Sequence, residues 1–296
     1  MNIGAYLRER RFHESATAVA AYRGLRRGAS KAGFQVVLKT FYSPIPELAE
    51  LPAGIFERRS QLPGVRFDLD AQLAFLRDRA ELMASFAPER YSADNPSYSL
   101  LDATVLYGVL RELKPRRVVE LGSGQTTLVM AQAGRENAGE SHPLRLDAYD
   151  PYPAVADDFL PGLNALHRVA AQDVPLAVFE ELEAGDVLFV DTTHTVKVGS
   201  DVNFIVLEVL PRLAAGVVVH VHDVFLPYEY PRRWPEDFGL YWSEQYLVQA
   251  FLALNPSFEV LCAVAALHRD RHAELERLLP GPSVVDGSAF WMRRTA

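Results

Sequence analysis

From about residue 99 onward, short apolar runs alternate with longer stretches in which apolar residues recur every three or four positions. The runs have the length and β-branched content of buried strands, and the stretches between them have the period of helices. The expected strands cover 117–121, 144–149, 167–171, 186–190, 216–222, 258–264 and 289–292. The expected helices cover 99–114, 125–133, 156–166, 175–183, 200–213, 244–254 and 270–279, and Ser99 with Asp102 has the pattern of an N-terminal cap for the first of them. This alternation predicts an α/β fold with a doubly wound, mostly parallel, seven-stranded sheet.

Residues 1–94 lack this alternation and predict an α-rich N-terminal appendage. Residues 14–28 look helical, residues 34–39 form a short strand candidate, and a second helix is expected from Asp70. The apolar stripe of that second helix needs a partner surface. We therefore expect the appendage to pack on a main domain of residues 95–296 and to form part of the substrate pocket, as a cap.

The first strand of the main domain runs directly into a glycine loop. Val118, Val119 and Leu121 form an apolar run, and Gly122 and Gly124 follow it. Glycine allows a sharp turn and leaves no Cβ in the way of a ligand. The helix expected after this loop would present free N–H groups at its first turn. The pattern predicts a ligand site at this turn, although a tight strand-to-helix connection has the same appearance.

Two residues help to separate the ligands that use such a loop. A dinucleotide site would place a third glycine or an alanine where this chain has Thr127. Glu120, at the end of the strand, is unfavourable beside a pyrophosphate but suits a cationic ligand. The amino group and sulfonium of S-adenosylmethionine (SAM) are such a ligand, so the loop favours SAM over NAD.

Composition narrows the function classes further. Of the 296 residues, 49% are apolar and 23% are charged, which is ordinary for a folded globular protein. The net charge of −8 provides no broad basic surface for nucleic acid. With Cys262 as the one cysteine, neither an intrachain disulfide nor a cysteine metal cluster can form. The sequence has no secretory signal pattern and no run near the roughly 20 apolar residues that span a bilayer, so we expect a cytoplasmic protein without membrane partners.

Polar residues follow the second and third strands, where an open α/β sheet binds its ligands. Asp150 is placed to accept hydrogen bonds from the two hydroxyls of a cofactor ribose, because a carboxylate can accept from both. An Asp-Pro turn is the alternative for this residue. Gln172 and Asp173 are placed to meet an adenine edge, and a helix cap is an equal alternative for Asp173.

The fourth and fifth strands end in residues suited to proton and metal chemistry. The fourth is followed by Asp191 and His194, and the fifth ends in His220, His222 and Asp223. Alternate residues of a strand share a face, so His220 and His222 point the same way, with His222 nearer the mouth. Adjacent parallel strands would bring Asp191 close to His222 and Asp223. These three could hold a divalent metal, with His220 left as a core residue.

These motifs resemble those of the class I, Rossmann-like, SAM-dependent methyltransferases. The first is Val-Val-Glu-Leu-Gly-Ser-Gly at 118–124, and Asp-x-x-His at 191–194 with His-Asp at 222–223 resembles a poorly characterised subgroup. The resemblance covers about residues 95–291 and implies that SAM contacts Glu120, Gly122, Ser123, Gly124, Asp150, Gln172 and Asp173.

Within that class, the metal-dependent O-methyltransferases of the catechol type imply further roles. Asp191, His222 and Asp223 fall on their metal ligands, and His194 falls on the lysine that deprotonates the acceptor hydroxyl. A histidine at 222 would favour a transition metal such as Mn or Zn over Mg. An imidazole has an ordinary pKa near 6.5, which suits a general base at neutral pH. His194 and Asp191 are the expected catalytic residues.

The leading hypothesis is therefore O-methylation of a small-molecule or sugar hydroxyl, with SAM as cofactor and His194 or a metal-bound hydroxyl accepting the proton. Aromatic residues in three segments could line the acceptor pocket: Tyr42, Tyr98, Tyr228 and Trp234. A metal-dependent hydroxylase or hydrolase on the same fold is one alternative, and a non-catalytic partner-binding module is another. The acceptor's identity and a homo-oligomeric state stay open.

Overall fold

The structure is a computed structural model, and it describes residues 15–40, 42–154, 159–279 and 286–296. The chain divides into two compact units, Met1–Ala53 and Gly54–Ala296. Residues 54–94, which the sequence assigned to the appendage, therefore belong to the same compact unit as the sheet.

The N-terminal unit contains one regular helix, α2 (Ala16–Lys31), among its described residues. The helix begins after Ser15, whose Oγ accepts a hydrogen bond from the amide of Ala18 at 3.3 Å. No residue of α2 is buried. The strand expected over 34–39 is absent, and this segment has no regular secondary structure.

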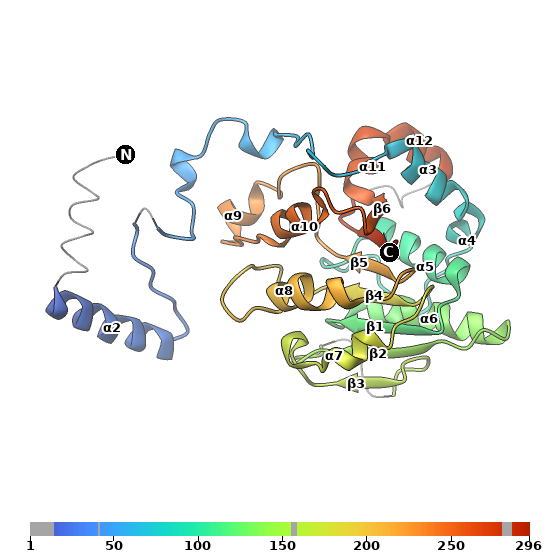
Figure 1. The fold of residues 1–296 in the computed structure, drawn as a ribbon, viewed down its shortest axis with the longest axis horizontal. Coiled ribbons are helices and arrows are strands. Elements are labelled where there is room, and N and C mark those ends of the chain that lie inside the picture. The colour runs from blue at the N-terminus through green and yellow to red at the C-terminus, as the bar shows by residue number, and fades with distance from the viewer. Residues whose placement is uncertain (1–14, 41, 155–158, 280–285) are drawn as a thin grey trace. The chain divides into compact units, whose positions relative to one another are not determined.

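The second unit contains a seven-stranded sheet in the order β3-β2-β1-β4-β5-β7-β6 (Figure 1). Its strands are β1 (Arg117–Leu121), β2 (Arg145–Tyr149), β3 (Ala165–His167), β4 (Val187–Val190), β5 (Val218–Val221), β6 (Phe258–Ala263) and β7 (Phe290–Arg294). The first five are parallel, whereas β7 runs antiparallel to both β5 and β6. The predicted doubly wound, mostly parallel sheet is confirmed.

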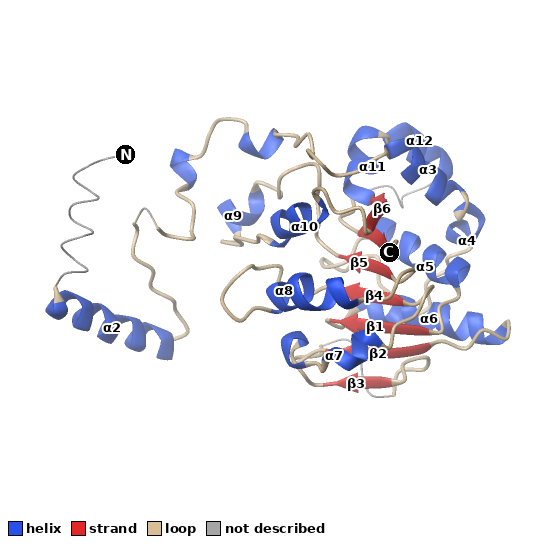
Figure 2. Cartoon of the chain, in the orientation of Figure 1, coloured by secondary structure: helices blue, strands red, loops and turns tan. Residues whose placement is uncertain are grey.

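Helices cover both faces of this sheet (Figure 2). One core lies under α3 (Leu69–Arg77), α4 (Ala80–Ala84), α5 (Leu100–Leu113), α6 (Gln125–Gly139), α11 (Val264–Asp270) and α12 (His272–Leu278). The other lies under α7 (Leu176–Glu180), α8 (Asp201–Phe204) and α10 (Glu244–Leu252), while α9 (Arg233–Asp237) lies in the long loop after β5. Val118 faces the first core and Val119 the second, as the alternation of a strand requires. No helix in the described ranges is long and apolar enough to cross a bilayer.

The boundaries differ from the sequence prediction mainly around β3. The expected helix over 156–166 partly falls outside the described residues, and Ala165–His167 at its end is strand instead. These residues pair with β2, so sheet pairing outweighs the local helical pattern. The expected helix over 200–213 is broken, because α8 ends at Phe204 and a π-helical turn and a 3₁₀ turn follow it.

The glycine loop between β1 and α6 is held close to β4. Gly122 has a φ of +86°, and a Cβ at this position would lie 1.9 Å from the main-chain oxygen of Asp191. Gly122 also donates its amide hydrogen to the oxygen of Tyr149 at 2.9 Å. Glycine is therefore required here both by the backbone conformation and by the close approach of β4.

Glu120 fixes the first turn of α6 from below. Its carboxylate accepts hydrogen bonds from Thr126 Oγ1 at 2.6 Å and Thr127 Oγ1 at 2.8 Å. Thr127 Oγ1 also accepts from the amide of Gly124 at 2.9 Å. Burial raises the pKa of Glu120 to about 8, and the two threonine hydroxyls oppose that rise. Glu120 and Thr127 thus tie the end of β1, the loop and the helix together.

Replacing Gly122 by alanine should destabilise the fold, because the new Cβ would clash with backbone rather than with a flexible side chain. We expect a loss of about 2 kcal/mol or more in the free energy of unfolding, measured by urea denaturation. Gly124→Ala is the matched control, since a Cβ there meets nothing within 4 Å. Equal stability of the two variants would contradict the proposed close approach.

Glu120 should make stability depend on pH. The native state keeps its proton up to about pH 8, whereas the unfolded chain releases it near 4.5. The native state binds more protons in this window, so stability should fall as pH rises from about 5 to 8, by up to ~1.4 kcal/mol per pH unit. Glu120→Gln should lack this slope. If the free energy of unfolding depends on pH in the same way in wild type and Glu120→Gln, the buried carboxyl is not protonated in the native state.

Candidate functional site

A pocket of about 510 Å³ lies at the carboxyl ends of the parallel strands. Four of the predicted cofactor residues line it, together with one of the two predicted catalytic residues: Gly122, Ser123, Asp150, Gln172 and Asp191. The strand registers explain the grouping. Leu121 pairs with Tyr149 on one side and with Val190 on the other, so the residues that follow these three strands meet at one edge.

Asp150 is tied to the glycine loop. Its Oδ2 accepts hydrogen bonds from the amide and hydroxyl of Ser123 at 2.9 and 2.8 Å, and its Oδ1 accepts from the amide of Tyr152 at 2.7 Å. A carboxylate oxygen has two lone pairs, so Oδ1 keeps one acceptor position. Asp150 can therefore still accept a ligand hydroxyl at the pocket.

Three predicted cofactor residues are outside the pocket lining. The carboxylate of Glu120 is buried and bonded to Thr126 and Thr127, as described above. Gly124 lies in the loop at the start of α6, and Asp173 is exposed at the end of a 3₁₀ turn. Conversely, Lys197 does line the pocket, which no sequence motif indicated.

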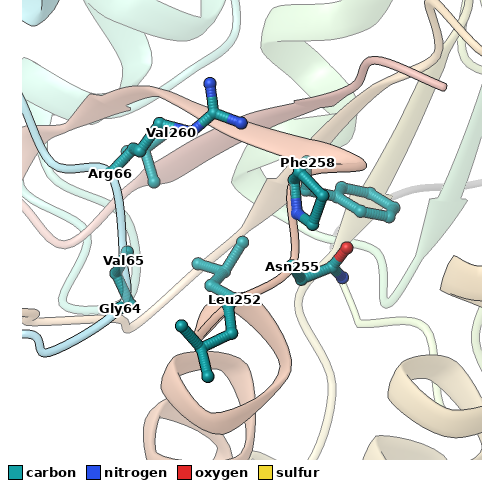
Figure 3. A pocket seen from close by; sticks show the side chains of 9 residues that line it. Gly64, Val65, Arg66, Leu252, Asn255, Phe258 and Val260 are labelled. Carbon is teal, nitrogen blue, oxygen red and sulfur yellow. The ribbon is translucent and has the colours of Figure 1, made fainter.

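A second hollow, of about 230 Å³, lies far from these strand ends (Figure 3). It is formed by Gly64 to Arg66, the end of α10 and the start of β6 at Phe258. β6 begins opposite Arg294 at the end of the antiparallel β7, and Arg293 pairs with the start of β5. This hollow is therefore at the opposite edge of the sheet, and none of the predicted site residues lines it.

The predicted catalytic and metal residues meet beside the larger pocket. Val190 pairs with Val221, so Asp191 and His222 leave adjacent strands at the same level. Asp191 Oδ1 lies 3.2 Å from His194 Nε2 and 3.6 Å from His222 Nδ1. Asp223 Oδ2 lies 3.7 Å from His194 Nε2 and 3.5 Å from His222 Nδ1. Each of the two carboxylates therefore lies within ion-pair distance of both imidazoles.

The backbone at this cluster is unusual. His194 and Asp223 have φ values of +54° and +56°, in the left-handed region that residues other than glycine rarely adopt. Non-glycine residues held in that region concentrate at functional sites. His194 contacts Asp191, and Asp223 contacts both imidazoles, so both residues in this conformation place their side chains in the cluster.

His194 is enclosed almost completely. Its Nδ1 lies 2.9 Å from Oε2 of Glu244, and its ring centroid is 4.3 Å from that of Trp242. Burial lowers the pKa of His194, but the carboxylates of Asp191 and Glu244 outweigh burial and raise it to about 10. His222 and His194 together lower the pKa of Asp191 despite its burial. In the free protein, His194 is therefore an imidazolium paired with carboxylates, not the neutral base that the sequence suggested.

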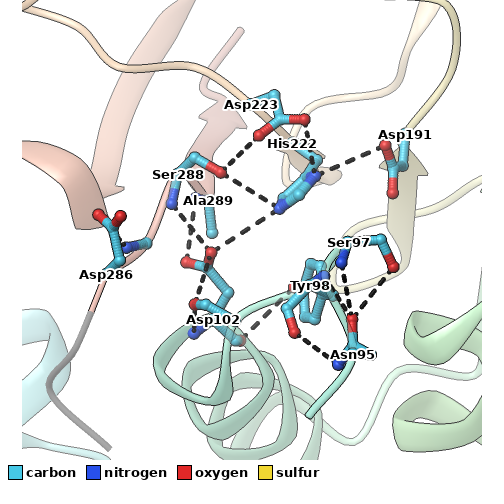
Figure 4. A network of polar contacts seen from close by, with 12 residues as sticks. Asn95, Ser97, Tyr98, Asp102, Asp191, His222, Asp223, Asp286, Ser288 and Ala289 are labelled. Atoms are coloured by element: carbon cyan, nitrogen blue, oxygen red, sulfur yellow. Dashed lines mark hydrogen bonds and ion pairs between the residues drawn. The ribbon is translucent and has the colours of Figure 1, made fainter. Parts of the chain in front are cut away.

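His222 is oriented by residues from α5 and the segment before β7 (Figure 4). Its Nε2 lies 3.2 Å from Ser288 Oγ and 3.7 Å from Asp102 Oδ2, and Ser288 Oγ donates to Asp223 Oδ1 at 2.8 Å. Asp102 also accepts the amide hydrogens of Ser288 and Ala289. Burial lowers the pKa of His222, yet the surrounding carboxylates raise it well above its ordinary value.

His220 behaves differently, as a core residue. It is fully buried and stacks on Phe189 with centroids 4.0 Å apart, with Trp291 at its edge. Neither ring nitrogen has a hydrogen-bond partner in the structure. Burial and the neighbouring His222 lower its pKa, so His220 is neutral.

The predicted metal set, Asp191, His222 and Asp223, comes together without forming a metal site. Across the described ranges, no three or more His, Cys, Asp or Glu side chains are arranged so that they could hold a metal ion. As they lie, these residues do not fit the metal of the catechol-type enzymes.

The predicted acceptor-pocket aromatics occupy separate places. Tyr98 is buried under the site, with its ring centroid 4.7 Å from that of His222. Trp234 packs edge-on against Trp242, which covers His194. Tyr228 donates its hydroxyl hydrogen to Asp270. Tyr42 belongs to the N-terminal unit, where it is exposed.

Three residues of the cluster were missed by sequence reasoning as site members. Asp102 was identified only through its capping pattern with Ser99, a bond that the structure confirms at 3.0 Å. Glu244 begins a helix and Ser288 precedes a strand, and neither position carries a motif. Their proximity arises from β7 lying beside β5 and from the start of α10 bonding to the main-chain oxygen of His194, which depends on the tertiary fold.

Comparison with known proteins agrees with this architecture. Residues 119–224 match a family model described as a methyltransferase domain. An uncharacterised protein of Archaeoglobus fulgidus is 28% identical over 167 residues, which cover 48% of this chain and 72% of that protein. The family model's residues, 119–224, begin in β1 and end just after His222 and Asp223, so they include the glycine loop and the histidine cluster.

Two solved structures have a slightly similar fold. A CmcI structure with SAH has a TM-score of 0.41 and 17% identity, covering 72% of this chain and 85% of that one. A CmcI structure with Mg and SAM has a TM-score of 0.40 and 18% identity, covering 72% and 78%. These likenesses carry no argument about the site. With the match to a methyltransferase domain over residues 119–224 and the seven-stranded order with its reversed β7, the chain has the class I, Rossmann-like fold of SAM-dependent methyltransferases.

Proposed function

We propose that this chain is a SAM-dependent O-methyltransferase acting on a hydroxyl of a small molecule or sugar. The observation that carries the proposal is that Gly122, Ser123, Asp150 and Gln172 line the same pocket as Asp191. Its volume, about 510 Å³, lies in the range of small-molecule sites. Asp191, which lines the pocket, in turn contacts His194 and His222, the residues suited to proton transfer.

The pocket residues suit the parts of SAM, which when bound supplies a methyl group on a sulfonium. Gly122 and Ser123 line the pocket where α6 begins, and the open lone pair of Asp150 Oδ1 can accept a ribose hydroxyl. Gln172 lies beside them with groups suited to an adenine edge. Glu120, whose oxygens are bonded to Thr126 and Thr127, would shape the loop rather than touch the ligand.

His194 is our candidate for accepting the proton of the acceptor hydroxyl. Its pKa is raised because Asp191 and Glu244 stabilise the imidazolium. A cationic ligand beside Asp191 would compete for that carboxylate and lower the pKa of His194 toward neutrality. The neutral imidazole could then take a proton through Nε2, and Asp191 would orient the ring.

The acceptor would lie against aromatic side chains near His194. Trp242 covers one face of the imidazole, and Trp234 packs against Trp242. Aromatic faces beside carboxylates suit the apolar faces and hydroxyl groups of sugars and phenols. The proposed proton transfer does not involve a metal, because Asp191, His222 and Asp223 as they lie do not fit one.

The test is transfer of a labelled methyl group from SAM to a panel of sugars and phenols. Once an acceptor is found, His194→Gln and Asp191→Asn should each lower turnover by about 100-fold or more, the range for loss of general acid or base help. His268→Gln, in α11 and outside the cluster, is the matched control and should leave turnover unchanged. Full turnover in both site variants would contradict the roles assigned here.

A further inference from the structure

Glu244 is a buried acidic residue beside His194 that does not line the proposed cofactor pocket. Its side chain is 1% exposed, and Oε2 lies 2.9 Å from His194 Nδ1. Oε1 is buried and has no hydrogen-bond partner among the residues that the structure describes. A buried carboxylate with a single partner is costly to keep, because the ion must be stripped of water. The contact with His194 is therefore the interaction that must explain why this carboxylate is buried.

The start of α10 also holds the main chain of His194. The oxygen of His194 accepts hydrogen bonds from the amides of Ser243 at 2.8 Å and Glu244 at 3.1 Å. Ser243 Oγ accepts from the amide of Val196 at 2.9 Å. These bonds support the left-handed conformation of His194, so one helix end fixes both its backbone and its ring.

Simple capping of the helix does not explain the carboxylate. Acidic residues at the first turn of a helix are stabilising where they bind or face its free N–H groups. Here Oε2 is directed to an imidazole of another segment, and α10 shows no side-chain cap hydrogen bond. The carboxylate is committed to His194 rather than to its own helix.

The two ring nitrogens of His194 thus face different partners. Nδ1 faces Glu244, whereas Nε2 faces Asp191 at 3.2 Å and Asp223 at 3.7 Å. The contact with Glu244 is the shorter one, and a carboxylate bonded to one imidazole nitrogen keeps the proton on that nitrogen, so Nε2 is left for exchange once a ligand competes for Asp191. We propose that Glu244 is a positioning residue, which holds the Nδ1 proton of His194 so that Nε2 faces the reacting groups. This inference rests on the proposed function, in which His194 accepts a proton through Nε2.

The test is the spectrum of imidazole N–H protons in protein labelled with ¹⁵N-histidine, recorded without cofactor. Wild-type protein should show one Nδ1 proton shifted far downfield and slow to exchange, and His194→Gln should remove it. Glu244→Leu keeps the volume but removes the acceptor, so the resonance should disappear. Glu244→Gln keeps a neutral acceptor, so the resonance should move upfield without vanishing.

Glu259→Gln is the matched control, because Glu259 pairs with Arg293 at an exposed edge and should leave the resonance in place. In the methyl-transfer assay, Glu244→Leu should lower kcat by about 10-fold or more and leave the KM for SAM within about twofold. A wild-type spectrum without this proton, or one in which it survives in Glu244→Leu, would overturn the inference. Failure of methyl transfer by wild type would instead overturn the proposed function, since the spectrum needs no cofactor.

Discussion

The close contact between the glycine loop and the end of β4 is the constraint on which the site depends. Because Gly122 lies against the main-chain oxygen of Asp191, the loop that shapes one side of the pocket is fixed to the end of β4, where Asp191 contacts His194 and His222. Asp150 ties the same loop to β2 through Ser123. A shift of β1 relative to β4 would therefore separate the glycine loop from the residues at the end of β4.

A second constraint is the charge buried beside that contact. His194 and His222 stand among Asp102, Asp191, Asp223 and Glu244, and even with both imidazoles protonated the carboxylates outnumber them. Burying ion pairs stabilises a fold little, because the loss of hydration offsets much of their attraction. The cluster is better understood as a site that favours a cationic ligand, and the left-handed backbone of His194 and Asp223 points the same way.

Much of the fold followed from periodicity, because an alternating pattern of buried strands and helices has few other solutions. The strand-end residues Asp150, Asp191 and His222 were predictable for the same reason, since parallel strands align their carboxyl ends. Glu244 and Ser288 were not, because they approach the site from α10 and from the segment before β7. The state of His194 was also out of reach, because its pKa depends on the carboxylates that the tertiary fold places around it.

The central claim is that the pocket at Gly122, Asp150 and Asp191 binds SAM and its product S-adenosylhomocysteine. The most direct measurement is a calorimetric titration of folded, metal-stripped protein with S-adenosylhomocysteine, repeated with Asp150→Ala. The account predicts micromolar binding by wild type that is weakened in the variant, with loss of the hydrogen bonds that a ribose would make. Folded wild-type protein that shows no binding would contradict it.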